Sequence, residues 1–127
     1  MPVKTIHQKH YIPATAEEVY RALTNPFTIE LWSGYPAKMS TEKDSEFSLF
    51  EGDIVGKNLE FRENELIKQQ WYFEGEKEIS VVTLLLIPEK KNTVIELIHT
   101  HIPDEVYDEM VQGWKKYYFG SLKQFFR

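Results

Sequence analysis

The chain carries two hydrophobic periods, and their order along the sequence predicts its architecture. Val3–Ile12 and Thr93–Ile102 alternate apolar with polar residues, the period of two that is typical of strands with one buried face. Shorter runs rich in β-branched and aromatic residues predict further strands between them, at Phe47–Phe50, Ile54–Phe61, Leu66–Phe73 and Ile79–Ile87. We therefore expect an antiparallel sheet built mainly from the middle of the chain.

Two short helices are predicted between the first strand and the rest of the sheet. The stretch Thr15–Glu18 has the pattern of a capping box, in which the threonine hydroxyl and the glutamate side chain cap the helix start reciprocally. At Asn25-Pro26 the chain offers a side-chain cap followed by proline at the first helical position. We expect the first helix to end at Thr24 and the second near Trp32, before Gly34 and Pro36.

The last quarter of the chain, Pro103–Arg127, has one long helical pattern loaded with aromatic residues, and Asp104 is its expected N-cap. At 100° per residue one broad apolar arc holds Val106, Met110, Trp114, Tyr117, Ser121 and Phe125, widened by Tyr107, Val111, Tyr118 and Leu122. So wide a face needs a large apolar surface, and the sheet is the candidate. The fold class is α+β, with helices on one side of an antiparallel sheet, in one domain over residues 1–127.

Two glycines inside this helical pattern allow two interpretations. Gly113 and Gly120 each cost about 1 kcal/mol relative to alanine in a helix. They indicate either a structural role, which is close packing on the sheet or a kink at Gly120-Ser121, or a pocket widened beside Trp114 and Tyr117. The first interpretation is the commoner one for glycine in a helix.

Composition excludes several classes of function. The net charge of -5 argues against a nucleic-acid partner, which demands clustered Lys and Arg. The absence of cysteine excludes disulfides, thiolate metal sites and cysteine nucleophiles. The chain shows neither a leader-like apolar segment nor a run long enough to span a bilayer, so we expect a cytoplasmic protein.

Catalytic chemistry has few candidates. Histidines occur at four positions, on the first and last predicted strands: His7, His10, His99 and His101. They could bind zinc or move a proton if they converged, but a His-x-His pair lacks a complete ligand set, and the favoured interpretation is residues at the rim or surface of the sheet. No nucleophile elbow, phosphate loop or carboxylate pair stands out. We expect no catalytic residue, no metal and no cofactor.

Several short motifs, in a fixed order, resemble known families. The stretch Ala14–Pro26, followed by Trp32, resembles the opening of the START-like, helix-grip superfamily of polyketide cyclases and pollen allergens. A more specific run resembles the C-terminal domain of activators of the heat-shock protein 90 ATPase and their bacterial single-domain homologues: Phe50–Gly56, Ile67–Trp71, Ile102-Pro103 and Gly113-Trp114. The resemblance covers nearly the whole chain.

The resemblance implies a curved antiparallel sheet wrapped around the C-terminal helix, with two short helices between the first and second strands. In that superfamily the space between sheet and helix often holds an apolar molecule. The function expected on this basis is non-catalytic binding of a hydrophobic or lipid-like molecule, lined by Phe61, Trp71, Leu85, Leu97, His99, Trp114 and Tyr117.

Two alternatives remain open on the same resemblance. One is a chaperone-associated interaction module that contacts a heat-shock protein 90 through an exposed patch around Trp32–Met39. The other is a cyclase or hydrolase that uses His99 or His101. The eukaryotic activators carry a separate N-terminal domain, and because the predicted final domain begins at about Val3, we expect no ATPase stimulation in their manner.

Overall fold

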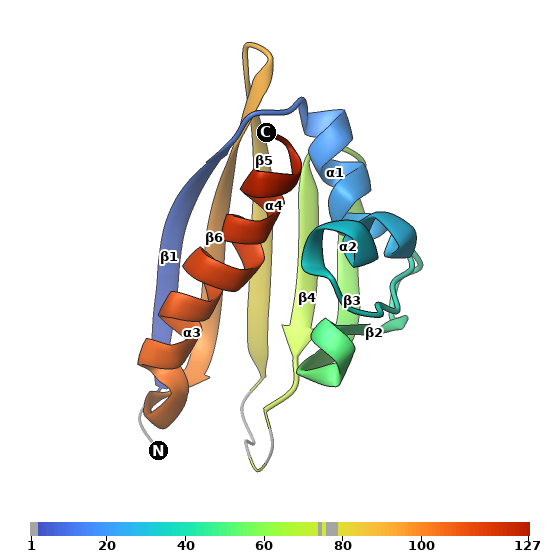
Figure 1. Cartoon of the computed structure of the whole chain (residues 1–127). Coiled ribbons are helices and arrows are strands. Elements are labelled where there is room, and N and C mark those ends of the chain that lie inside the picture. Colours follow the sequence, from blue (N-terminus) through green and yellow to red (C-terminus); the bar gives the residue numbers. More distant parts are fainter. Residues whose placement is uncertain (1–2, 74, 76–78) are drawn as a thin grey trace.

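A six-stranded antiparallel sheet, bent around one long C-terminal helix, forms the frame of the protein (Figure 1). The computed structural model describes residues 3–73, 75 and 79–127. The strand order is β1-β6-β5-β4-β3-β2. The strands are β1 (Val3–Ile12), β2 (Glu46–Leu49), β3 (Ile54–Arg62), β4 (Leu66–Trp71), β5 (Ser80–Glu89) and β6 (Asn92–Pro103). The predicted α+β helix-grip fold is confirmed.

Alternation along the central strands decides which side chains face the helix. On β5 the buried positions are Ser80, Val82, Leu84 and Leu86, and on β6 they include Thr93, Ile95, Leu97 and His99. The register pairs Val82 with His99 and Leu84 with Leu97, so these residues share the inner face. Leu85 points to the opposite face because successive strand residues alternate, which corrects its expected place in the lining.

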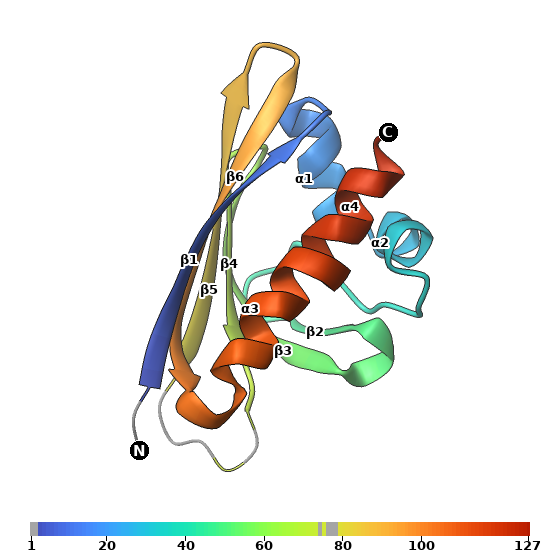
Figure 2. The same cartoon turned by 60° about the vertical axis from the view of Figure 1, so that its left-hand side comes forward.

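Two short helices lie on the same side of the sheet as the C-terminal helix, as Figure 2 shows. The helix α1 (Ala16–Thr24) begins with the predicted capping box, in which the Glu18 amide donates to Thr15 Oγ1 at 3.2 Å. The helix α2 (Pro26–Ser33) is capped by Asn25 and ends at Gly34, whose φ of 82° suits glycine. The predicted short helices and their caps are therefore confirmed.

The C-terminal segment runs as one helical rod through several hydrogen-bonding patterns. A 3₁₀ turn η2 (Asp104–Val106) precedes α3 (Tyr107–Gly113), a π-helical segment η3 (Trp114–Phe119) and α4 (Gly120–Phe125). Asp104 was expected as the N-cap of one α-helix, but no side chain caps η2 or α3, and Asp104 pairs with Lys4 at 3.0 Å.

The π-helical segment changes which residues of this helix face the sheet. Tyr117 is 60% exposed and Phe125 is 39% exposed, although the α-helical period places both on the apolar arc. In a π-helix the bonded residues are five apart, so Phe119 follows Trp114 by one turn and stacks on it at 5.5 Å. The buried stripe is therefore rotated, and it consists of Trp114, Tyr118, Phe119 and Leu122.

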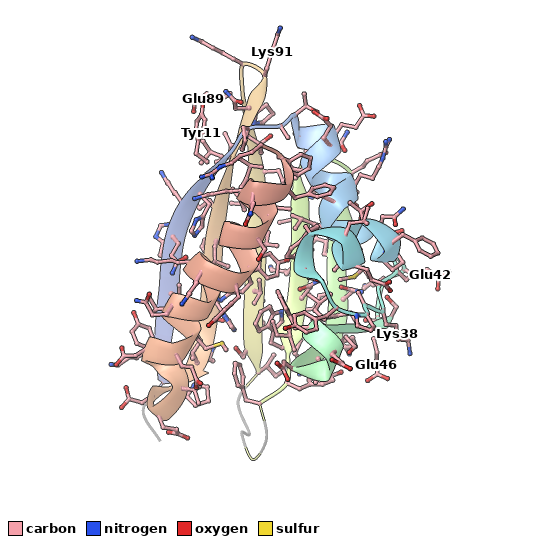
Figure 3. All side chains as sticks on the ribbon, in the orientation of Figure 1. Tyr11, Lys38, Glu42, Glu46, Glu89 and Lys91 are labelled. Carbon is pink, nitrogen blue, oxygen red and sulfur yellow. The ribbon has the colours of Figure 1, made fainter. Side chains whose placement is uncertain are left out.

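Charged side chains cover the outside of this frame (Figure 3). Glu89 and Lys91 project from the tip of the β5–β6 hairpin, while Lys38, Glu42 and Glu46 lie along the side of β2. Within the described residues, no helix has the length and apolar character needed to cross a membrane.

Candidate functional site

A cleft of about 690 Å³, open to solvent on one side, lies between the C-terminal helix and the turn that joins β2 to β3. That turn is η1 (Phe50–Gly52). The sheet side and the end of α2 contribute Ser33, Tyr35, Phe50, Glu51, Asp53, Ile54 and Trp71. The C-terminal helix contributes Glu109, Met110, Gly113, Trp114, Tyr117, Tyr118 and Ser121.

Two stacked and nearly buried indoles form part of the cleft wall. Trp71 ends β4 and Trp114 begins the π-helical segment, and their ring centroids lie 4.7 Å apart with the planes inclined by 24°. Both side chains are almost fully buried, at 5% and 3% exposure. A ligand that enters the cleft would therefore meet aromatic surface.

The indole N–H groups of these tryptophans are satisfied inside the protein. Trp71 Nε1 donates to Gln69 Oε1 at 3.1 Å, and Gln69 Nε2 donates in turn to Asn58 Oδ1 at 3.0 Å. The Asn58 amide then donates to the carbonyl oxygen of Ser40 at 3.1 Å. This buried chain of hydrogen bonds ties the indole of Trp71 to the loop before β2, so its N–H is not available to a ligand.

His99 holds the other indole and is itself fully enclosed. Trp114 Nε1 donates to His99 Nδ1 at 3.1 Å, while Ser80 Oγ lies 2.9 Å from Nε2 and 2.8 Å from the carbonyl oxygen of Thr100. Because Ser80 donates to that carbonyl, it accepts from an Nε2–H, which assigns the neutral tautomer. Burial lowers the pKa of His99 to about 3. Both ring nitrogens are therefore occupied, and neither is open to the cleft.

The remaining histidines do not join His99. His7 faces the outer side, where Nε2 lies 2.6 Å from Glu96 Oε2, because the register places Ile6 opposite His99. His10 is buried and stacks on Phe119 at 4.0 Å, and His101 is exposed with a φ of 54°. The expectation of a rim or surface position is thus wrong for the two buried histidines, and the described residues contain no group of three metal-ligating side chains.

The seven residues expected to line a cavity separate into three groups. Trp71, Trp114 and Tyr117 line the cleft. Leu97 and His99 are fully buried in the core behind the indoles. Phe61 borders a separate surface depression, and Leu85 faces the other side of the sheet.

One of the two glycines in the C-terminal helix, Gly113, supports the interpretation that a small residue widens a pocket. A Cβ at Gly113 would meet no atom within 4 Å, and this residue lines the cleft. A Cβ at Gly120 would lie 3.0 Å from the carbonyl oxygen of Lys115 in the same helix. Neither glycine marks a close approach to the sheet, so the packing interpretation is wrong.

The acidic rim of the cleft is not predicted from the sequence. Three exposed carboxylates from two distant segments are among the lining residues, those of Glu51, Asp53 and Glu109. Phe50 and Glu51 have φ values of 52° and 55°, a region that non-glycine residues rarely adopt. The residues Glu51-Gly52-Asp53 are typical of a turn, but nothing local in them indicates that this turn lies beside the C-terminal helix.

Tyr118 is a nearly buried residue of the cleft wall whose polar atom has no partner among the described residues. The side chain is 4% exposed and packs on Trp32 and Trp114, at centroid distances of 5.2 and 4.6 Å. Its hydroxyl makes no hydrogen bond to a described residue, whereas every fully enclosed polar side-chain atom there has a partner. The oxygen of Tyr118 therefore opens onto the cleft, and burial raises the pKa of this phenol far above its usual range.

Several solved structures share this architecture. An HSP90 activator from Plasmodium falciparum superposes with a TM-score of 0.87 at 23% identity, covering 95% of this chain and 94% of that one. CalU16 from Micromonospora echinospora superposes with a TM-score of 0.84 at 27% identity, covering 98% of this chain and 75% of that one. The Aha1 dimer from Colwellia psychrerythraea gives 0.85 at 17% identity, covering 97% and 96%.

Sequence comparison leads to the same group of proteins. The activator of 90 kDa heat shock protein ATPase homolog 1 is 25% identical in mouse and in human, over 99% of this chain. The chain spans 38% of the length of these curated relatives. A profile of the family described as "Activator of Hsp90 ATPase homolog 1-like protein" matches residues 13–127. This chain belongs to that family.

Proposed function

We propose that the cleft binds a hydrophobic small molecule without catalysing a reaction on it. The observation that carries this proposal is a space of about 690 Å³ with the stacked indoles of Trp71 and Trp114 in its wall. Ligand sites in proteins are commonly apolar clefts of roughly 300–1,000 Å³ with few polar groups. The volume and the aromatic wall of this cleft match that description.

The side chains around the cleft favour binding over chemistry. Both nitrogens of His99 are engaged, by Ser80 and Trp114, so this imidazole has no free lone pair for a substrate. Gly113 leaves open space where any other side chain would project. The cleft thus offers aromatic surface and open space, while the nearby imidazole of His99 is engaged elsewhere. This arrangement favours binding a ligand over converting it.

The expected affinity of a simple probe follows from buried area. A two-ring aromatic compound that buries about 200 Å² of apolar surface gains at most about 5 kcal/mol, so its dissociation constant should be no tighter than roughly 10⁻⁴ M. Such affinities are measurable by NMR titration. Ligands that fill the cleft more completely should bind more tightly.

The test combines native mass spectrometry with an NMR titration of lipids and aromatic compounds. We expect a co-purified or added ligand, and shifts of the indole signals of Trp71 and Trp114. In a Gly113→Leu variant, the new side chain should occupy the cleft and abolish these shifts. A Glu89→Gln variant, changed at the far tip of the β5–β6 hairpin, serves as the control. Binding that is equal in all three proteins would overturn the proposal.

A second candidate function is an interaction with a heat-shock protein 90 chaperone, and an exposed apolar patch on α2 favours it. Phe27 and Leu31 are 77% and 72% exposed and lie four residues apart on one helix face, with Tyr35 nearby at 48%. The patch was expected around Trp32–Met39, but both of those end residues are buried, at 6% and 8% exposure. Trp32 Nε1 donates inward to the carbonyl oxygen of Ala22 at 2.8 Å.

A pull-down with a purified heat-shock protein 90 tests this second function. Relatives are named as activators of that chaperone's ATPase, so capture of the chaperone is the expected result. A Phe27→Ser/Leu31→Ser variant should lose capture while keeping its fold, since both side chains point to solvent. No capture by the unmodified chain would contradict an interaction role.

A further inference from the structure

The rim of the cleft carries charge of one sign. Glu51 and Asp53 come from the turn between β2 and β3, and Glu109 comes from α3. All three are exposed, and none forms an ion pair with another described residue. Among the described residues that line the cleft there is no Lys, Arg or His. Three carboxylates beside one opening create a negative potential at the mouth.

The interior of the cleft adds a separate polar contact. The Tyr118 hydroxyl lacks a partner among the described residues, although its side chain is only 4% exposed. Its oxygen is accessible from the cleft, where water can hydrate it, and a bound molecule with an acceptor would replace that water by a direct hydrogen bond. The surrounding rings of Trp32, Trp114 and Phe119 hold the phenol in place.

We infer that the cleft selects a hydrophobic cation, a molecule with an aromatic or alkyl body, an oxygen acceptor for Tyr118 and a protonated amine at the acidic rim. This inference rests on the proposed binding function and specifies its ligand class. The body lies on Trp71 and Trp114, while the ammonium group stays near Glu51, Asp53 and Glu109, partly hydrated. Fatty acids and other carboxylates are disfavoured by the same charges.

Three probes with one ring system separate charge from hydrophobicity. They are 1-naphthylmethylammonium, the neutral 1-naphthylmethanol and the anion 1-naphthoate, each titrated by NMR at low ionic strength. Each exposed charge pair contributes modestly, so the ammonium probe should bind about tenfold tighter than the alcohol, and the carboxylate more weakly than either. The preference should shrink in about 0.5 M salt, where charges are screened within a few ångströms.

Variants assign the charge preference to the rim. The triple variant Glu51→Gln/Asp53→Asn/Glu109→Gln should remove the advantage of the ammonium probe, which should then bind no more tightly than the alcohol. The matched control Glu42→Gln/Glu65→Gln/Glu89→Gln changes net charge equally at exposed positions that do not line the cleft, and should keep the preference. An equal preference for the ammonium probe over the alcohol in both triple variants would overturn the inference, because the preference would then depend on the net charge of the protein and not on the rim.

The hydrogen bond assigned to the Tyr118 hydroxyl is tested with two uncharged probes. Tyr118→Phe should weaken binding of 1-naphthylmethanol by roughly fivefold and leave 1-methylnaphthalene unchanged, since only the alcohol offers an acceptor. Equal loss for both compounds would overturn the assigned contact.

The outcomes also separate this inference from the proposed function. If the neutral and anionic probes bind as tightly as the ammonium probe, the cleft binds hydrophobic molecules and the charge selection is wrong. If none of the probes shifts the indole signals, the proposed function fails and the inference fails with it.

Discussion

Two histidines of this protein are buried without charge, and each is held by specific neighbours. His99 lies between Ser80 and Trp114, and His10 lies between Gln8, at 2.7 Å, and Lys123, at 3.3 Å. Burial lowers the pKa of His99 to about 3. Burial, with the positive charges of Lys123 and Lys115, lowers the pKa of His10 to about 4. The neutral imidazoles are part of the folded structure rather than a reactive site.

Stability should therefore fall on mild acidification. An unfolded histidine takes up a proton near pH 6.5, whereas folded His99 and His10 stay neutral to about pH 3 and 4. Unfolding thus takes up protons between these values, and stability present above pH 6.5 is lost as the pH falls. Between about pH 7.5 and 5, each histidine should remove roughly 2 kcal/mol from the free energy of unfolding. Urea denaturation at the two pH values measures this loss.

The control for this prediction is His10→Gln, which keeps a polar side chain but removes the titration. Its free energy of unfolding should fall by about 2 kcal/mol less than that of the unmodified chain over the same pH interval. An equal fall in both proteins would show that His10 is charged in the folded state.

The contact between His99 and Trp114 gives a second prediction at the residue scale. Trp114→Phe removes the N–H that His99 Nδ1 accepts and leaves that nitrogen enclosed without a partner. The expected loss is about 2–4 kcal/mol, from the unsatisfied acceptor and the smaller ring. Thermal unfolding measures it, with Tyr117→Phe, a change at a 60% exposed ring, as the control. A Trp114→Phe midpoint equal to that of the control would contradict the hydrogen bond.

At the scale of elements, the C-terminal helix determines the cleft through its π-helical segment. The five-residue hydrogen-bonding pattern of η3 places Trp114 and Phe119 on the same face and leaves Tyr117 at the edge of the cleft. The two glycines flank this segment, with Gly113 before it and Gly120 after it. An added methyl group would meet open space at Gly113 and a backbone carbonyl at Gly120, so the same substitution at both positions gives a matched comparison.

Replacing each glycine with alanine should have different effects. At Gly113 the backbone is α-helical and a methyl group meets nothing within 4 Å, so alanine should stabilise the protein by about 0.5–1 kcal/mol. At Gly120 the methyl group would lie 3.0 Å from the carbonyl oxygen of Lys115, and the gain should be cancelled or reversed. Urea midpoints of the two variants measure the difference. Equal stabilisation by both would contradict the π-helical geometry.

The sequence predicts the elements well because their signals are local. The capping box at Thr15, the cap at Asn25 and the alternation of β6 each arise from neighbouring residues, and the structure confirms them. The faces of the C-terminal helix could not be predicted, because the π-helical segment shifts the α-helical period and turns Tyr117 and Phe125 outward.

At the scale of the whole molecule, the cleft depends on contacts between distant segments. Its wall combines Glu51 and Trp71 from the sheet side with Glu109 and Trp114 from the C-terminal helix, and the two tryptophans stack on each other. Sequence patterns could identify Trp71, Trp114 and Tyr117 as candidates, but not the acidic rim, since nothing local brings Glu51 near α3. The positive φ at Phe50, which shapes the turn, has no sequence signal either.

The proposed binding surfaces of the molecule are the cleft and the α2 patch of Phe27, Leu31 and Tyr35. Both attract apolar groups, so binding alone does not identify which one a ligand occupies. The most direct measurement is a set of intermolecular NOEs between 1-naphthylmethanol and the unmodified protein. If the ligand lies in the cleft, NOEs are expected from the naphthalene ring to side-chain protons of Trp71, Trp114 and Tyr118. NOEs confined to Phe27 and Leu31 would contradict binding in the cleft.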